Sequence, residues 1–183
     1  MKNAIKLFLQ TVGLFALLLC VTLATLSLKY RGADGPSLLF PGGKLVSGSL
    51  HQGADPDWSF TDQVGTIELE TSDPVSSRRI FVMESGGKIY VGSAYMRSML
   101  GRLWKDWAFD VEEAGARDAV ARIEGVRYER ELIRVNDPKI VEGVARKSAM
   151  KYAGGATPEA VAQIMKRVAD GDTWLFELAP RSR

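Results

Sequence analysis

The sequence has almost no side chains that form disulfides or bind soft metals. Its 183 residues include one cysteine and one histidine, Cys20 and His51. A lone cysteine cannot form an intrachain disulfide, and these two side chains cannot supply the several thiolate or imidazole ligands of a zinc site. The composition therefore excludes a disulfide scaffold and a metal site built from cysteine or histidine, and we expect no metal.

A surplus of charge of either sign is also missing. The chain has 24 basic and 22 acidic residues and a formal net charge of +2. Proteins that bind the nucleic acid backbone concentrate lysine and arginine on one face or along one helix. The sequence shows no such concentration, so we expect no nucleic acid partner. With 46% hydrophobic residues, the chain is sufficient for one domain with its own core.

Charged residues are absent from a long apolar run near the N-terminus, Leu7 to Leu28. A helix of this length extends for about 33 Å, close to the ~30 Å hydrocarbon core of a bilayer. The alternative is a cleaved signal peptide, whose apolar region has about 7–15 residues and ends at a small-residue cleavage site. Ser27-Leu28-Lys29 matches such a site poorly. We therefore predict an uncleaved membrane anchor over residues 1–31.

The orientation of this anchor follows from its flanking charges. Lys2 and Lys6 precede the apolar run, and Lys29 and Arg31 follow it, so the positive-inside bias is weak. The short basic tail favours an N-terminus in the cytoplasm. We therefore expect a single-pass protein of the cell membrane, with a spacer at residues 32–43 and an extracytoplasmic domain at residues 44–183.

The pattern after the spacer predicts a mixture of strands and helices. Residues 65–71 alternate between apolar and polar, which is typical of a half-buried strand, and we expect the face with Glu68 and Glu70 to be solvated. Asp137-Pro138 and Thr157-Pro158 are helix starts, because each pairs a capping side chain with a proline in the first turn. Strands are predicted at 44–50, 65–71, 79–83, 88–93, 118–123, 126–135 and 173–178, and helices near 102–114, 137–152 and 157–169. This order favours an α+β fold around an antiparallel sheet.

The candidate binding residues lie between Arg78 and Trp107. Two short strands flank Ser85-Gly86-Gly87, a hairpin signal because glycine reaches the positive φ that tight turns require. A loop with Arg97, Ser98 and Arg102 then leads into an amphipathic helix, whose N-terminus would present free N–H groups to an anion. The alternatives are a solvated hairpin edge and, beside a membrane, a contact with anionic lipid headgroups.

Three stretches resemble the flavin-binding split-barrel proteins, which include the pyridoxamine phosphate oxidase-like and deazaflavin-dependent nitroreductase-like proteins. The first is the arginine-led strand at residues 77–83, and the second is the strand at residues 87–93 with its basic loop. The third is the hairpin at residues 120–129. The likeness extends from about Lys44 to Pro180. It implies an antiparallel split β-barrel with about three helices.

The resemblance also implies a site for the phosphate of FMN or a deazaflavin. Carried over by position, its residues would be Arg78, Arg79, Ser93, Arg97, Ser98 and Arg102, with catalytic residues unknown. Glu84 departs from the family, which favours a basic residue there, and a carboxylate would repel phosphate.

Two functions stay open. One is a membrane-anchored flavin- or deazaflavin-dependent oxidoreductase of unknown substrate, and the other is a non-catalytic envelope protein that binds a ligand, a partner or a lipid surface. A homodimer is a further expectation.

Overall fold

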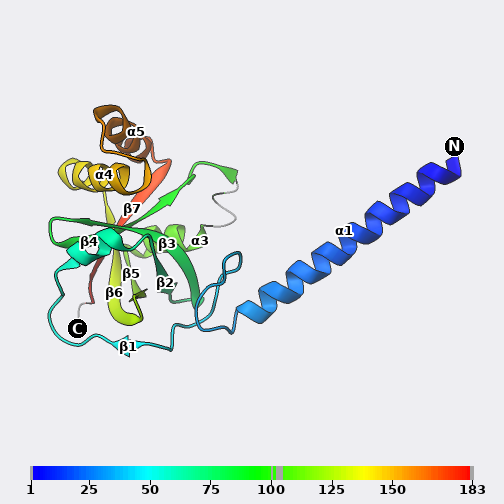
Figure 1. Ribbon diagram of the computed structural model, residues 1–183, viewed down its shortest axis with the longest axis horizontal. Coiled ribbons are helices and arrows are strands. Elements are labelled where there is room, and N and C mark those ends of the chain that lie inside the picture. Colours follow the sequence, from blue (N-terminus) through cyan, green and yellow to red (C-terminus); the bar gives the residue numbers. More distant parts are fainter. Residues whose placement is uncertain (1, 100, 102–104, 182–183) are drawn as a thin grey trace.

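A long helix stands apart from a β-barrel in the computed structural model, which describes residues 2–99, 101 and 105–181 (Figure 1). Helix α1 covers Lys2–Tyr30, and its large apolar side chains are exposed. Residues Asn3–Tyr30 are long and apolar enough to cross a membrane, a test that a signal sequence also passes.

Six antiparallel strands form a closed barrel. They are β2 (Thr66–Thr71), β3 (Ser76–Ser85), β4 (Lys88–Ala94), β5 (Ala116–Ile123), β6 (Val126–Val135) and β7 (Thr173–Pro180). Their spatial order is β2-β3-β4-β7-β6-β5, and β5 pairs with β2 again. A two-residue strand, β1 (Ser49–Leu50), adds to the start of β6 in parallel. The predicted antiparallel split barrel is thus confirmed.

The barrel interior is filled by alternate residues of these strands. Ile67, Leu69, Val82, Val91 and Phe176 belong to this core. Helix α3 (Asp106–Ala114) packs on the same core through Trp107, Ala108 and Val111, and the 3₁₀ helix η1 (Trp58–Gln63) adds the fully buried Trp58.

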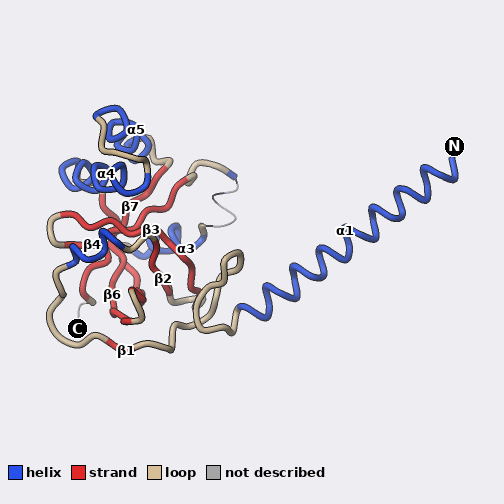
Figure 2. Tube along the Cα trace, in the orientation of Figure 1, coloured by secondary structure: helices blue, strands red, loops and turns tan. Residues whose placement is uncertain are grey.

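Two helices cover part of the outer surface of the barrel (Figure 2). They are α4 (Pro138–Tyr152) and α5 (Pro158–Ala169), and a second core joins them to β3, β4, β6 and β7. The Asp137 carboxylate accepts from the N–H of Lys139 at 2.8 Å, and the Thr157 hydroxyl accepts from the N–H of Ala160 at 3.2 Å. Both predicted helix starts are therefore confirmed, and capping side chains determine them.

Two predicted elements differ from those observed. The strand expected at 44–50 is reduced to Ser49–Leu50, because the Leu45 N–H donates to the Glu70 carboxylate at 2.6 Å instead of to a neighbouring strand. The expectation that Glu70 is solvated is accordingly wrong, since its residue is 7% exposed. The helix expected at 102–114 is described from Asp106 onward, and residues 102–104 lie outside the described residues.

Residues 31–48, which include the predicted spacer, are fastened to the barrel around Arg122 on β5. The Arg122 guanidinium lies 2.7 Å from the Asp34 carboxylate and 2.5 Å from that of Glu68, and it donates to the Ser47 hydroxyl at 2.7 Å. Its side chain is 11% exposed. Close backbone packing adds to the attachment, because a Cβ at Gly42 would lie 2.0 Å from the Gly35 carbonyl oxygen. We call this arrangement the Arg122 clasp.

We expect Arg122→Ala to lower the free energy of unfolding by about 2–4 kcal/mol, because it leaves two partly buried carboxylates without their cation. Urea unfolding of the full chain in detergent measures the change. Arg146→Ala is the matched control, since Arg146 pairs with Glu142 on an exposed helix face, and its cost should stay within about 0.5 kcal/mol. Equal losses in the two variants would show that the clasp contributes no special stability.

The Arg122 clasp should also make the free energy of unfolding depend on pH. The pKa of Asp34 lies well below its usual range, first because of a side-chain hydrogen bond with Ser47 and further because Val46, Ser47 and Arg122 donate to it. A carboxylate whose pKa is lowered by folding stabilises the protein above its unfolded pKa, about 4, and this contribution falls as the pH drops toward the folded value. The stability difference between the wild type and Asp34→Asn should therefore be constant above about pH 5 and shrink below about pH 4. A difference independent of pH down to pH 3 would contradict this account.

Candidate functional site

Two of the predicted phosphate-binding residues face the barrel interior. The Arg78 guanidinium lies over the Trp107 ring, 5.2 Å from its centroid, and donates to the Thr71 hydroxyl at 3.1 Å. Burial lowers the pKa of Arg78 to about 10, although the negative charges of Asp106 and Asp110 act to raise it. The guanidinium therefore stays charged at neutral pH. Ser93 is 0% exposed, and its hydroxyl has no hydrogen-bond partner among the described residues.

The remaining predicted residues lie on the outside. Arg79 is exposed on β3. Arg97 is exposed in the loop after β4, with a guanidinium nitrogen 3.4 Å from the Asp170 carbonyl oxygen. The Ser98 hydroxyl donates to the Tyr95 carbonyl at 2.8 Å and accepts from the Gly101 N–H at 2.9 Å, so it orders that loop.

The sixth predicted residue, Arg102, lies outside the described residues. Arg78 and Arg97 thus have different surroundings, one inside the barrel and one on its surface. Their convergence on a single anion stays a prediction.

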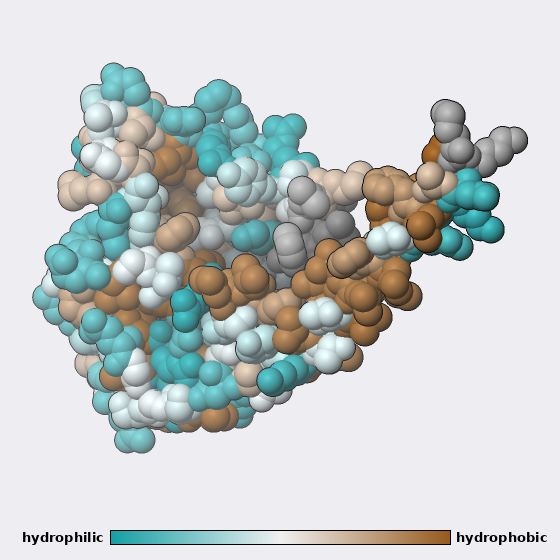
Figure 3. Space-filling model, turned by 45° about the vertical axis from the view of Figure 1, so that its right-hand side comes forward, coloured by the Kyte–Doolittle hydropathy of each residue, from teal (hydrophilic) through white to brown (hydrophobic). Residues whose placement is uncertain are grey.

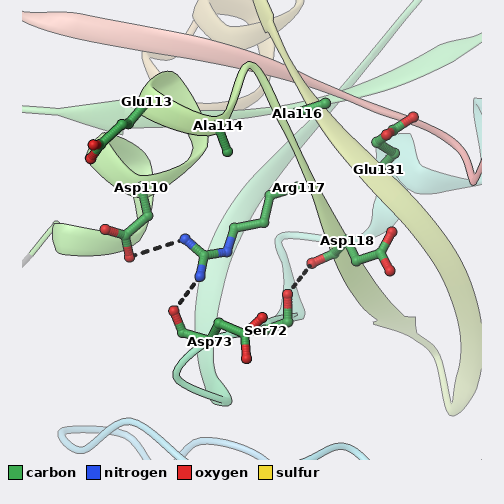
Figure 4. A pocket seen from close by; sticks show the side chains of 9 residues that line it. All are labelled: Ser72, Asp73, Asp110, Glu113, Ala114, Ala116, Arg117, Asp118 and Glu131. Carbon is green, nitrogen blue, oxygen red and sulfur yellow. Dashed lines mark hydrogen bonds and ion pairs between the residues drawn. The ribbon is translucent and has the colours of Figure 1, made fainter.

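A cleft of about 560 Å³ opens at the α3 end of the barrel, between α3, the start of β5, β6 and the turn from β2 to β3 (Figure 4). We call it the acidic cleft. Five carboxylate side chains and one cationic side chain are among its lining residues, which are Ser72, Asp73, Asp110, Glu113, Ala114, Ala116, Arg117, Asp118 and Glu131. Carboxylates around one open hollow give it a negative potential, which salt screens because the hollow is exposed to solvent.

The one cation of the acidic cleft is held by its neighbours. Arg117 lies 3.3 Å from the Asp110 carboxylate and also donates to the Asp73 carbonyl, so it ties α3 to the turn after β2 (Figure 4). Asp118 and Glu131 lie on the other side of Arg117 in this view. At the rim, Arg181 pairs with Asp118 at 3.1 Å. Arg117 and Arg181 thus offset the charges of Asp110 and Asp118, whereas Asp73 and Glu113 have no ion pair among the described residues.

The acidic cleft violates two rules of local stability. Glu112 and Glu113 occupy the last turn of α3, which has no basic residue, although the negative end of the helix dipole disfavours carboxylates there. Asp118 and Glu131 stand directly opposite each other in the β5–β6 pair, where like charges are destabilising, and the Arg181 guanidinium at 3.1 Å from Asp118 relieves part of this repulsion. Such local conflicts concentrate at functional sites.

The sequence analysis missed this site. The acidic end of the helix at residues 112–113 was visible, but the pairing of Asp118 with Glu131 requires the register of the hairpin. The carboxylates also come from separate elements, and the described residues include no group of three or more placed to hold a metal ion. The cleft therefore suits an extended cationic ligand better than a single metal ion.

A second hollow, of about 590 Å³, lies beside His51, Asp55 and Arg130. Arg130 is 2% exposed, donates twice to the Asp55 carboxylate at 2.6 and 3.0 Å, and lies 4.8 Å from the Trp58 ring centroid. The His51 ring packs 5.0 Å from the Tyr128 ring, and its Nε2 lies 2.8 Å from the Ala54 carbonyl oxygen. These contacts hold the segment after β1 against β6, while the buried Nε of Arg130 has no hydrogen-bond partner among the described residues.

Comparisons with known proteins identify the fold and nothing narrower. No family model and no curated protein matches the sequence. Among solved structures, the chain is similar to the conserved hypothetical protein Rv2991 from Mycobacterium tuberculosis, with 13% identity and a TM-score of 0.50 over 72% of this chain and 87% of that chain. A general stress protein 26 from Jannaschia sp. CCS1 gives 14% identity and a TM-score of 0.41 over 67% of this chain and 70% of that chain.

The first similarity carries the structural conclusion. The barrel shares its fold, an antiparallel split barrel, with the Rv2991 structure. Identity this low shows a shared fold and leaves function to the site itself.

We expect Glu113→Gln to raise the free energy of unfolding by about 0.3–1 kcal/mol, because it removes a carboxylate from the negative end of α3. The same urea titration measures the change. Glu159→Gln provides the reverse control, since Glu159 lies in the first turn of α5, where the dipole favours a negative charge. A loss of stability in Glu113→Gln would mean that the carboxylate supports the fold.

Proposed function

We propose that this protein is a membrane-anchored, non-catalytic split-barrel protein of the cell envelope that binds a cationic ligand in the acidic cleft. Helix α1 would cross the membrane once and hold the barrel outside the cytoplasm. The observation that carries the proposal is the surplus of carboxylates around a hollow of about 560 Å³. The ligand class that fits is an amine or a lysine-rich peptide segment.

The electrostatics of the α3 end support a cationic ligand over a phosphate. Asp106 and Asp110 on α3 lie near Arg78, and their negative charges offset part of its positive charge. Asp110 also pairs with Arg117. Lys105 adds a second positive charge near Arg78, since burial lowers the pKa of Lys105 and the charge of Arg78 lowers it further. Asp73 and Glu113, which have no ion pair among the described residues, would repel a phosphate, which carries close to two negative charges.

The surroundings of Ser93 and Arg78 also favour binding over flavin chemistry. A cofactor cannot touch Ser93, which is 0% exposed, unless the barrel wall opens. Arg78 lies against Trp107, which is 4% exposed. The flavin-dependent oxidoreductase is the alternative, favoured by the fold and by the exposed Arg97 beside Ser98. It would need a phosphate site on the loop after β4.

We expect the full chain in lipid nanodiscs to bind spermidine and a lysine-rich peptide, and Glu113→Gln to weaken both by roughly fivefold. The loss of one nearby carboxylate removes about 1 kcal/mol of attraction. Isothermal titration calorimetry measures the affinities, which should fall as salt is raised because exposed charges are screened. Glu159→Gln on α5 serves as the matched control and should leave both affinities unchanged.

The opposing result is equally clear. A yellow purified protein that releases a flavin in mass spectrometry, or one that binds FMN in a manner lost in Arg97→Ala, would support the oxidoreductase. Failure of both cationic probes at low salt would end the proposal of a cation-binding cleft.

A further inference from the structure

The most exposed large apolar side chains beyond α1 gather in two loops. They are Leu38 (84% exposed) and Leu39 (79%) in the loop after α1, and Tyr95 (63%) and Met99 (82%) in the loop after β4. Both loops lie on the side of the barrel turned toward α1 (Figures 1 and 2). Single exposed apolar residues are common on soluble proteins. Four of the most exposed ones beside a helix suited to a bilayer need a different explanation.

The first loop is fixed at the end of α1. The Phe40 ring stacks on the Tyr30 ring at 5.5 Å with an angle of 5° between the planes. Tyrosine at the end of a transmembrane helix lies at the level of the lipid headgroups. Because Leu38 and Leu39 immediately precede Phe40, they lie close to that level.

The loop is also ordered before any contact is made. The Ser37 hydroxyl accepts from the N–H of Phe40 at 2.8 Å and from that of Leu39 at 3.3 Å. Residues 31–48 are in turn fastened to the barrel by the Arg122 clasp. Insertion of the two leucines would therefore cost little additional conformational entropy.

The second loop combines apolar and basic side chains. Tyr95 and Met99 flank the exposed Arg97, and the Ser98 hydroxyl closes the turn between them. Aromatic and basic side chains are the usual anchors at a membrane surface, because the rings suit the headgroup level and the cations meet anionic lipids. In Figure 3 the surface of α1 is largely hydrophobic, whereas hydrophilic atoms are spread over the barrel domain.

We propose that these two loops rest on the bilayer, so that Leu38, Leu39, Tyr95 and Met99 enter its interfacial region beside α1. The inference rests on the proposed membrane anchor. The bilayer is the occupant that the structure favours, because the first loop lies at the end of the helix that would span it and the second lies on the same side of the barrel (Figure 1). The barrel would then be held against the membrane in one orientation instead of swinging on a tether.

Depth-dependent fluorescence quenching tests the contact in the full chain. Leu39→Cys and Met99→Cys are each made in a Cys20→Ser background, labelled with the environment-sensitive dye NBD and reconstituted into vesicles. Leu50→Cys is the matched control, because Leu50 is also an exposed leucine but lies on β1, away from both loops (Figure 1). A fourth sample carries the label on the native Cys20 and reports whether α1 is in the bilayer.

Labels at positions 39 and 99 should show blue-shifted emission and lose intensity to a lipid that carries a quencher near its headgroup. The label at position 50 should show neither effect. If Cys20 is in the bilayer but positions 39 and 99 behave like position 50, the loop contact is overturned while the anchor stands. If Cys20 itself is outside the bilayer, the proposed anchor fails, and the loop contact fails with it.

Discussion

The arrangement of the whole chain depends on the ion pairs of Arg122. This one guanidinium meets Asp34 from the segment after α1 and Glu68 from the neighbouring strand β2. It therefore joins the barrel wall to the polypeptide that leads from the apolar helix. Without it, the segment would be held mainly by hydrogen bonds such as those of Gly42 with Ser77 and of Leu45 with Glu70, and the barrel could sample more orientations. With the Arg122 ion pairs in place, the segment after α1 is held in one position against the barrel wall.

At the α3 end of the barrel, the positive charge of Arg78 lies inside and the negative charges of the acidic cleft lie outside. Arg78 points inward, with its guanidinium against the face of the Trp107 ring, and the carboxylates of α3, β5 and β6 surround the mouth outside. The inward cation needs negative charge nearby because burial disfavours a lone charge. The outer carboxylates exceed that need, since Asp73 and Glu113 have no ion pair among the described residues and Glu113 also opposes the helix dipole. This excess favours a cationic ligand, and the split-barrel fold supplies only the frame on which the carboxylates stand.

Local signals predicted most of the fold, and long-range contacts account for what they missed. The strands and the two capped helices follow from alternation and from Asp137 and Thr157, which act on residues within one turn. Glu70 was misplaced because its partner, Leu45, lies 25 positions away. The prediction that Arg78 and Ser93 bind a phosphate stays a prediction, and which side of the wall they face depends on barrel closure. The acidic cleft required the register of β5 against β6, which no local pattern supplies.

Hydrogen exchange of the backbone amides at residues 42–47 tests the central claim, that the segment after α1 and the barrel form one body. The amides of Leu45, Val46 and Ser47 donate to the carboxylates of Glu70 and Asp34, and that of Gly42 donates to Ser77 on β3. The account predicts that these amides exchange as slowly as those of β2 and β5 in the wild type and much faster in Arg122→Ala. Rapid exchange in the wild type, at the rate of an unstructured linker, would contradict it.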